Sequence, residues 1–268
     1  MVAARDGDRR ALERLLALYE PAILRFSSRL CRDPEDAQDV LQDSLLAMAR
    51  TVKDFRGASS VSTWAYAIAR SFCLKRRRRG KSALSGERPI EAEPESSLPA
   101  TEDAGPEESL ARKELGAALE TAIRALEPKY REVLLLRDVE GLSAPEVGEV
   151  LGIGIPAIKS RLHRARLAVR EQLAPLLEPP ELRRRDPGCP DIARLLSRHL
   201  EGEIGPESCA AMERHLEGCE VCRATCDSLR ASLALCKSLP AAPVPPELER
   251  TIRASVRRLV GEPTAQGG

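Results

Sequence analysis

The chain has 268 residues, which allows two or three small domains, each with a modest core. Aromatic residues make up only 3% of the sequence, and Leu, Ala, Arg and Glu dominate, so we expect an almost all-α protein. The net charge of +1 does not exclude nucleic acid as a partner, because the basic residues are concentrated in two clusters without acids, at 70–81 and 159–170.

The sequence contains no stretch near the ~18 apolar residues of a membrane span, and its charged first residues lack the apolar segment of a secretion signal. We therefore expect a cytoplasmic protein without membrane contact. In that compartment the eight cysteines are expected as thiols or metal ligands and not as structural disulfides. The sequence also lacks a recognisable nucleophile–base pair or phosphate-binding loop, so we do not expect an enzyme.

Residues 5–80 form the first predicted domain, and their apolar periodicity predicts helices. Asp33 and Pro34 form a cap and first-turn pair that opens one of these helices. A second helix is predicted to begin at 60–62 and to run through Trp64 into the first basic cluster.

Residues 81–108 are rich in acids and prolines and poor in large apolar residues, which predicts a flexible linker. Helical periodicity returns over 109–178. One helix is predicted before Glu127 and Pro128, and another over 129–138. Two short helices are predicted to follow, separated by residues 152–154.

The segment 141–170 predicts a helix-turn-helix that binds DNA. Ser143 is placed to cap the first helix. Gly152 permits the tight turn that such a motif needs, and Pro156 starts the second helix. Ile158 and Leu162 are spaced to face inward. The alternative is an ordinary bundle with a solvated basic helix, which charge alone does not exclude.

The second helix of such a motif lies in the major groove, with its N-terminal residues at the base edges and basic side chains on the phosphates. The outward face is predicted to carry Lys159, Ser160, Arg161, His163 and Arg164. The residues predicted nearest the bases are Pro156, Ala157, Ser160 and Arg161. Those predicted to hold phosphates are Lys159, Arg164 and Arg166.

Residues 186–239 hold six of the eight cysteines. His215, Cys219 and Cys222 have the spacing of metal ligands, with the two cysteines at a helix start and the histidine reaching the ion from the preceding helix end. Thiolate and imidazole ligands favour zinc or cadmium, with copper as a further candidate. The tail, 240–268, contains a short amphipathic segment from Leu248 to Leu259. This segment docks either on the N-terminal domains or only on the cysteine-rich helices.

Two separate motifs carry a family resemblance that covers roughly residues 8–175. The first motif resembles region 2 of the extracytoplasmic-function (ECF) sigma factors, group IV of the sigma-70 family, and segment 141–170 is similar to region 4.2 of the same family. The residues of the first motif are DPEDAQDVLQDSLLAMARTVKDFRG (33–57) and STWAYAIARSFCLKRRRR (62–79).

The resemblance implies an alternative sigma factor that directs RNA polymerase core to specific promoters. Residues 5–80 then correspond to region 2, a helical bundle for polymerase docking and the −10 element. Residues 109–178 correspond to region 4, for the −35 element. The implied partners are promoter DNA and core polymerase, through its β′ clamp helices and its β subunit.

The resemblance also assigns roles to individual residues. The polymerase-binding surface corresponds to Asp36, Asp39, Gln42 and Asp43. The −10 reader corresponds to the loop 55–60 and the helix after it, with Arg56, Ser59, Ser60, Arg70, Lys75 and Arg76 as its DNA-binding residues. Trp64 and Tyr66 are candidates to stack on bases, with a place in the core as the alternative for Trp64. Ser71 departs from the Asn that the family usually has, which affects the −10 preference and not the fold.

The cysteine pattern resembles the zinc-binding anti-sigma family, in which a further ligand lies well upstream, and Cys189 occupies that position. The implied site is Cys189, His215, Cys219 and Cys222. Cys209, Cys226 and Cys236 are in excess of four ligands, and are either additional ligands of a sensor or buried thiols.

Sigma regions followed by a cysteine-rich tail resemble the CorE-like metal-dependent ECF sigma factors. This resemblance implies that metal binding to the tail controls activity and that no separate anti-sigma protein is required. The alternatives are a thiol redox-sensing tail and a one-component DNA-binding regulator that never meets polymerase. The sequence leaves open which metal is sensed and whether it activates or inhibits.

Overall fold

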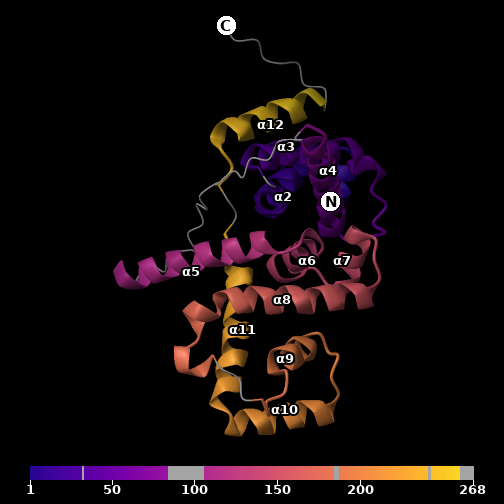
Figure 1. The fold of residues 1–268 in the computed structure, drawn as a ribbon. Helices are drawn as coiled ribbons and strands as arrows, with labels where there is room; N and C mark the ends of the chain where they lie inside the picture. The colour runs from indigo at the N-terminus through magenta and orange to yellow at the C-terminus, as the bar shows by residue number, and fades with distance from the viewer. Residues whose placement is uncertain (32, 84–105, 184–186, 241–242, 260–268) are drawn as a thin grey trace. The chain divides into compact units, whose positions relative to one another are not determined.

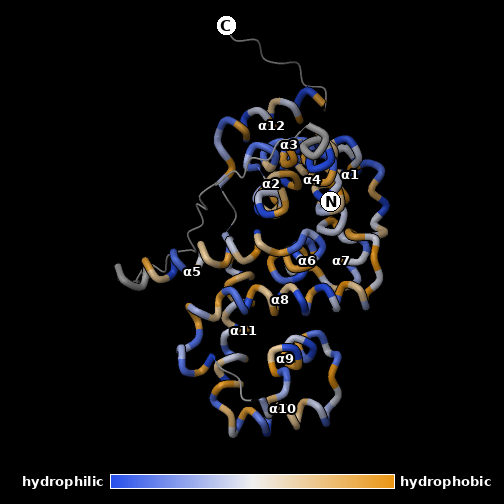
Figure 2. Tube along the Cα trace, viewed as in Figure 1, coloured by the Kyte–Doolittle hydropathy of each residue, from blue (hydrophilic) through white to orange (hydrophobic). Residues whose placement is uncertain are grey.

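The computed structural model describes residues 1–31, 33–83, 106–183, 187–240 and 243–259. All secondary structure in these ranges is helical, which confirms the all-α prediction (Figure 1). Hydrophobic and hydrophilic residues alternate along the helices, as expected for elements with one buried face (Figure 2). Within the same ranges, every helix is too short or too polar to span a bilayer. Of the predicted linker, residues 84–105 lie outside the described residues.

The chain divides into two compact units. The first unit comprises Met1–Ala92, Pro145–Gly152 and Ala241–Gly268, and the second unit comprises Glu93–Ala144 and Ile153–Pro240. The segments 109–178 and 186–239, predicted as separate domains, thus lie largely together in the second unit.

The helices of the first unit are α1 (Val2–Arg5), α2 (Arg9–Leu30), α3 (Pro34–Thr51), α4 (Val61–Ala83), α7 (Ala144–Leu151) and α12 (Pro246–Leu259). The Asp33 side chain accepts a hydrogen bond from the Glu35 N–H at 2.8 Å, and Pro34 occupies the first turn of α3. The predicted start of this helix is therefore confirmed.

The core of the first unit lies between α2, α3 and α4. Phe26 of α2 meets Tyr66 of α4 edge to face, with ring centroids 5.4 Å apart. Tyr66 is buried, so its ring belongs to the core, which rules it out as a candidate to stack on bases. Trp64 is half-buried and contacts Phe55, with centroids 5.2 Å apart.

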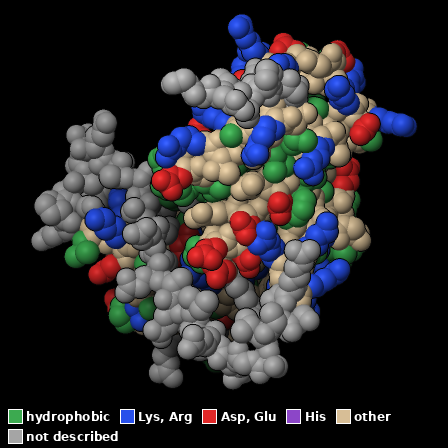
Figure 3. All heavy atoms as spheres, turned by 90° about the horizontal axis from the view of Figure 1, so that it is seen from above, with side chains coloured by type: hydrophobic (Ala, Val, Ile, Leu, Met, Phe, Trp, Pro, Cys, Tyr) green, Lys and Arg blue, Asp and Glu red, His purple; other side chains and the backbone are tan. Residues whose placement is uncertain are grey.

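Within the first unit, α12 packs on α3, and its residues Ile252 and Val256 have buried side chains. These residues are one helical turn apart, and they line a cavity of about 260 Å³ together with residues of α2 and α3. The amphipathic segment thus docks on the N-terminal helices, which decides between the two alternatives that the sequence left open. Basic and acidic side chains are interspersed on the face drawn in Figure 3, and Arg250 and Glu247 of α12 form such a pair at 3.7 Å.

The second unit contains α5 (Pro106–Ala125), α6 (Pro128–Leu134), a π-helical turn (Leu135–Val139), α8 (Ile155–Leu177), a 3₁₀ turn (Pro180–Leu182), α9 (Ile192–Leu200), α10 (Pro206–Gly218) and α11 (Glu220–Ser238). Helices α5, α6 and α11 all pack against α8. Gly141 and Gly152, with φ of +75° and +69°, end the elements that precede them.

Helix α8 is longer than predicted, because the sequence indicated a short second helix after Gly152. It continues for 23 residues to Leu177. The reason is that its apolar stripe extends beyond Leu162 to Val169 and Leu173, which are buried in the core of the second unit.

Candidate functional site

Four side chains from separate parts of the second unit meet at one point. Cys189 lies before α9, His215 in the last turn of α10, Cys219 at the junction of α10 and α11, and Cys222 in the first turn of α11. Their ligand atoms all lie within 4.8 Å of one another. The structure therefore brings together the three residues with metal-ligand spacing and Cys189, the ligand that the resemblance implied.

The spacing within this cluster suits a tetrahedral metal ion. The Sγ atoms of Cys189 and Cys219 are 3.7 Å apart, and His215 Nε2 is 3.2 Å from Cys222 Sγ. A tetrahedral zinc with Zn–S bonds of ~2.3 Å places its sulfur ligands about 3.8 Å apart. Three thiols and one imidazole are also a donor set that zinc prefers, so the cluster suggests metal binding.

The two cysteines at the start of α11, the N-cap Cys219 and Cys222 in the first turn, differ in acidity. The backbone N–H of Cys222, at the start of the helix, stabilises the Cys219 thiolate and lowers the pKa of that thiol. Burial raises the pKa of Cys222 to about 12, and the neighbouring Cys219 and Cys189 contribute to the increase. A metal ion would take both as thiolates, so its binding would release the proton of Cys222.

The three cysteines in excess of four ligands do not join this cluster among the described residues. Cys226 and Cys236 are almost fully buried, and Cys226 packs with Leu196 and Leu229 in the core beside the cluster. Cys209 instead contacts His199, with Sγ 3.2 Å from Nδ1. The structure thus favours buried thiols over additional ligands for Cys226 and Cys236.

Helix α8 carries the residues predicted to meet DNA from the second helix of the helix-turn-helix. Pro156, Ala157 and Ser160 are exposed in its first turns, and Arg161 is half-buried. Arg164 is exposed and donates a hydrogen bond of 3.0 Å to the Tyr130 hydroxyl.

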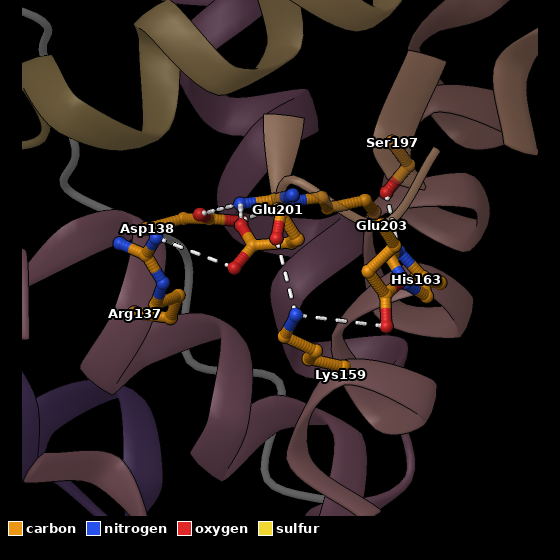
Figure 4. A network of polar contacts seen from close by, with 8 residues as sticks. Arg137, Asp138, Lys159, His163, Ser197, Glu201 and Glu203 are labelled. Atoms are coloured by element: carbon orange, nitrogen blue, oxygen red, sulfur yellow. Dashed lines mark hydrogen bonds and ion pairs between the residues drawn. The ribbon is translucent and has the colours of Figure 1, made fainter. Parts of the chain in front are cut away.

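Two acidic residues after α9 reach the basic side of α8 (Figure 4). Lys159 donates a 3.1 Å hydrogen bond to the carbonyl oxygen of Glu201, and its Nζ is 3.7 Å from a carboxylate oxygen of Glu203. His163 contacts Glu203 through Nε2, and its Nδ1 is 2.8 Å from the Ser197 hydroxyl. Burial alone would raise the pKa of Glu203, but its hydrogen bond to His163 and the charge of Lys159 outweigh this and lower it.

The same network corrects two predictions about α8. Arg166 was predicted to hold a phosphate, but it is buried and forms two hydrogen bonds to the Asp138 carboxylate, at 2.6 and 2.8 Å. It also pairs with Glu201 at 2.9 Å, and Arg137 pairs with the same carboxylate at 3.3 Å. His163 was predicted to face outward, yet it is only 9% exposed because Ser197 and Glu203 cover it.

Helix α9 connects the metal cluster to this network. On one side, Ile192 and Leu196 share a hydrophobic core with Cys222. On the other side, Ser197 and the C-cap residue Glu201 contact α8. One short helix therefore contacts both the core beside the cluster and α8.

In the first unit, α3 displays the acids that the family resemblance assigned to polymerase. Arg76 of α4 lies among three of them, at 3.6 Å from Asp36 and from Asp43 and in closer contact with Asp39. Gln42 is half-buried on the same helix. Arg76, predicted to bind DNA, is thus engaged by side chains predicted to bind polymerase.

The remaining residues of the predicted −10 reader lie in and around the start of α4. Arg56 is exposed and Ser59 half-buried. The Ser60 hydroxyl accepts a 3.1 Å hydrogen bond from the Thr63 N–H, so this side chain caps the first turn of α4. Arg70 is half-buried, and Lys75 is exposed with its Nζ 4.9 Å from the Phe72 ring centroid.

Family models match three segments of the chain. Residues 15–83 match "Sigma-70 region 2", residues 116–169 match "Sigma-70, region 4", and residues 189–223 match "Putative zinc-finger". The third segment contains all four residues of the metal cluster.

Curated relatives agree with these matches. The chain is 33% identical to the RNA polymerase sigma-H factor of Pseudomonas aeruginosa over 64% of this chain and 90% of that protein. It is 31% identical to the ECF RNA polymerase sigma-E factor of Salmonella typhimurium (strain LT2) over 64% and 91%. A solved complex of the sigma factor RpoE with the anti-sigma factor NepR from Bartonella quintana has a TM-score of 0.48 and 23% identity, covering 61% of this chain and 97% of that one.

The expectation that this chain requires no separate anti-sigma protein stays a prediction. Sigma factors bind RNA polymerase core and promoter DNA, and they are initiation factors and not enzymes. From its two sigma regions and its relatives, the chain belongs to the ECF sigma factors, which direct transcription initiation, and it carries a C-terminal domain of the putative zinc-finger family.

Proposed function

We propose that this ECF sigma factor is controlled by its own C-terminal domain. In this proposal Cys189, His215, Cys219 and Cys222 bind a metal ion, with zinc first and cadmium or copper as alternatives. The metal-loaded domain holds α8 and weakens promoter binding. The observation that carries the proposal concerns Lys159, a residue predicted to bind a DNA phosphate. Its ammonium group is hydrogen-bonded to the Glu201 carbonyl and paired with the Glu203 carboxylate.

Competition for Lys159 is the physical basis of the inhibition. A carboxylate beside a phosphate-binding lysine neutralises it and repels the phosphate that would replace it. The base-proximal residues Pro156, Ala157 and Ser160 remain exposed. The domain therefore acts on the affinity of α8 for the DNA backbone more than on its access to the bases.

The direction of the metal effect follows from the position of α9. Because Ile192 and Leu196 share a core with Cys222, a bound metal stabilises the arrangement in which α9 presents Ser197 and Glu201 to α8. A ligand shifts an equilibrium only by its differential affinity for the two states. We call the arrangement in which the C-terminal domain contacts α8 the held state. We therefore expect bound metal to favour the held state and metal removal to release α8.

In vitro transcription with core polymerase on fragmented genomic DNA tests this proposal. The metal-free wild type is expected to give several-fold more transcript than the zinc-loaded wild type. A Cys219→Ser, Cys222→Ser double variant is expected to respond to no metal. If the wild type and the double variant transcribe equally at every concentration of zinc, cadmium and copper, metal control is ruled out. The sigma activity itself would not be affected by that result.

The polymerase-binding surface of the proposal is the acidic face of α3, with Asp36, Asp39, Gln42 and Asp43. The carboxylates are 36 to 52% exposed as side chains, so a partner can reach them. A basic or polar partner surface would compete with Arg76 for them, which would free Arg76 for DNA. Charge reversal at Asp39 and Asp43 would then weaken a pull-down of core polymerase.

The C-terminal segment also contacts the N-terminal helices through α12, which packs on α2 and α3. The substitution Ile252→Ala is expected to weaken this docking. Removing a buried Ile side chain to Cβ costs about 2 kcal/mol at the low end of the usual range, or roughly 30-fold in the docking equilibrium. A detached helix of 14 residues is only marginally stable in water. Amide hydrogen exchange in α12 should therefore accelerate by roughly that factor. Arg250→Ala, whose side chain is 76% exposed, serves as the matched control and should leave the exchange unchanged.

Docking of α12 is also expected to depend on pH through Glu20, which lines the cavity beneath it. Burial, followed by the charge of Glu249, raises the pKa of Glu20, and Arg253 only partly opposes this. A carboxyl whose pKa is raised on docking favours the docked state when protonated. Docking should therefore weaken as the pH rises through the raised pKa of Glu20. In Glu20→Gln, hydrogen exchange in α12, corrected for its intrinsic pH dependence, should lose this slope, and a slope equal to that of the wild type would contradict the assignment.

A further inference from the structure

Two cysteines of the first unit have no part in the metal cluster. Cys31 follows the last residue of α2, and Cys73 lies on α4. Although 42 residues separate them, their Sγ atoms are 2.8 Å apart, closer than the 3.7 Å between Cys189 and Cys219 in the metal cluster. A disulfide bond is about 2.0 Å long, so the two sulfurs need to approach by less than about 1 Å to form one.

The surrounding packing keeps these thiols facing each other. Phe26 and Tyr66 hold the same two helices together by an edge-to-face contact, and Tyr66 lies two turns before Cys73 on α4. The backbone N–H of Cys31 donates a 2.8 Å hydrogen bond to the Ser27 carbonyl, which fixes the end of α2. Their proximity therefore follows from the packing of α2 against α4, with Cys31 tied to the last turn of α2.

Their exposures differ in a way that suits sequential oxidation. Cys31 is partly exposed, whereas Cys73 is buried. A small oxidant thus reaches Cys31 first, and the buried partner is in place to react with the product.

We propose that Cys31 and Cys73 are a redox-active pair that closes into a reversible disulfide under peroxide. The Cys31 thiolate attacks one peroxide oxygen and the O–O bond breaks. This gives a sulfenic acid and a hydroxide, which takes up the proton that the thiol lost on ionising and leaves as water. The Cys73 sulfur then attacks the sulfenic sulfur, the S–S bond forms, and a second water leaves. Two thiols and one hydrogen peroxide thus give one disulfide and two waters. Exchange with a small thiol restores the reduced pair.

The bond would tie the end of α2 to α4 just before the basic residues Lys75 and Arg76. It would enclose all of α3 in a covalent loop, together with the carboxylates that contact Arg76. Oxidation would thereby act on region 2 itself, independently of the metal cluster in the other unit.

The test uses the full-length, zinc-loaded protein, reduced and then treated with hydrogen peroxide. Free thiols are alkylated, and the protein is digested with trypsin, which places Cys31 in the peptide 30–32 and Cys73 in the peptide 71–75. Mass spectrometry is expected to show these two peptides joined, lighter by two hydrogen atoms than their sum, and separated again by dithiothreitol. Cys31→Ser and Cys73→Ser should each abolish the linked pair.

A second measurement covers the case in which the buried Cys73→Ser variant folds poorly. Peroxide should raise the denaturant midpoint of wild-type region 2, as followed by the fluorescence of Trp64, and should not raise it in Cys31→Ser. Separate alkylation of Cys31 and Cys73 after peroxide, or their linkage to cysteines of the C-terminal domain, would overturn the proposal.

Discussion

Glu201→Gln is expected to raise the affinity of the full-length protein for duplex DNA by up to roughly 100-fold. The Glu201 side chain is only 4% exposed and pairs with both Arg137 and Arg166. Glutamine keeps its size and removes its charge, which leaves the buried Arg166 guanidinium with Asp138 as its remaining carboxylate and the half-buried Arg137 without this carboxylate partner. Removing one partner of a buried ion pair costs about 3 kcal/mol, which corresponds to about two orders of magnitude in the held-to-released equilibrium.

Fluorescence anisotropy with a labelled duplex of arbitrary sequence is a suitable measurement, because the proposed competition concerns phosphates and not bases. Glu207→Gln provides the matched control, since it removes the same charge from an exposed position in the first turn of α10. Equal affinities of Glu201→Gln, Glu207→Gln and wild type would contradict the holding of α8 by the C-terminal domain.

The salt dependence of binding distinguishes release of Lys159 from general unfolding. Every additional phosphate that the protein neutralises steepens the slope of log affinity against log salt by ~0.9. Because Glu203→Gln frees the single charge of Lys159, the slope of this variant should be steeper than that of the wild type by about this amount. A change in affinity without a change in slope would assign the effect to something other than Lys159.

Sequence patterns predicted the elements whose signals are local. The Asp33–Pro34 pair at the start of α3 and Gly152 at the end of α7 are decided by the conformations of their own backbones, so composition and spacing reveal them. The suggested metal ligands His215, Cys219 and Cys222 follow the same logic, because they lie within one helix junction. Cys189 is distant in the sequence, and only the family resemblance pointed to it.

The contacts that the sequence did not reveal are between distant segments. Arg166 has the appearance of a phosphate ligand on a basic helix, and only the fold places Asp138 and Glu201 against it. Glu201 and Glu203 flank Gly202, a pattern typical of a solvent-exposed turn. Their partner Lys159 lies about 40 residues earlier in the sequence. The positive charge of the cluster 159–170 indicates that it has acidic partners, but it does not specify which acidic residues contact it. The place of Tyr66 in the core was not evident for the same reason, because its partner Phe26 is on another helix.

Removal of the metal ligands is the second change with a large expected effect. Cys219→Ser with Cys222→Ser takes away two of the four donor groups, so zinc bound after gel filtration should fall from about one equivalent to near zero. Cys222 also belongs to the core that holds Ile192, Leu196 and Met212. The loss should therefore loosen α9 to α11, with faster hydrogen exchange there and DNA affinity that approaches that of Glu201→Gln.

Cys226→Ala is the matched control for this loss. It lies one turn further along α11 and is equally buried, but it does not belong to the group of four. It should keep the full equivalent of zinc, and a metal loss equal to that of the double variant would show that the ligand set is different. The acidity of Cys222 adds an independent check. Because its pKa of about 12 means that its proton must leave when metal binds, zinc affinity should rise with pH in wild type and in Cys226→Ala alike.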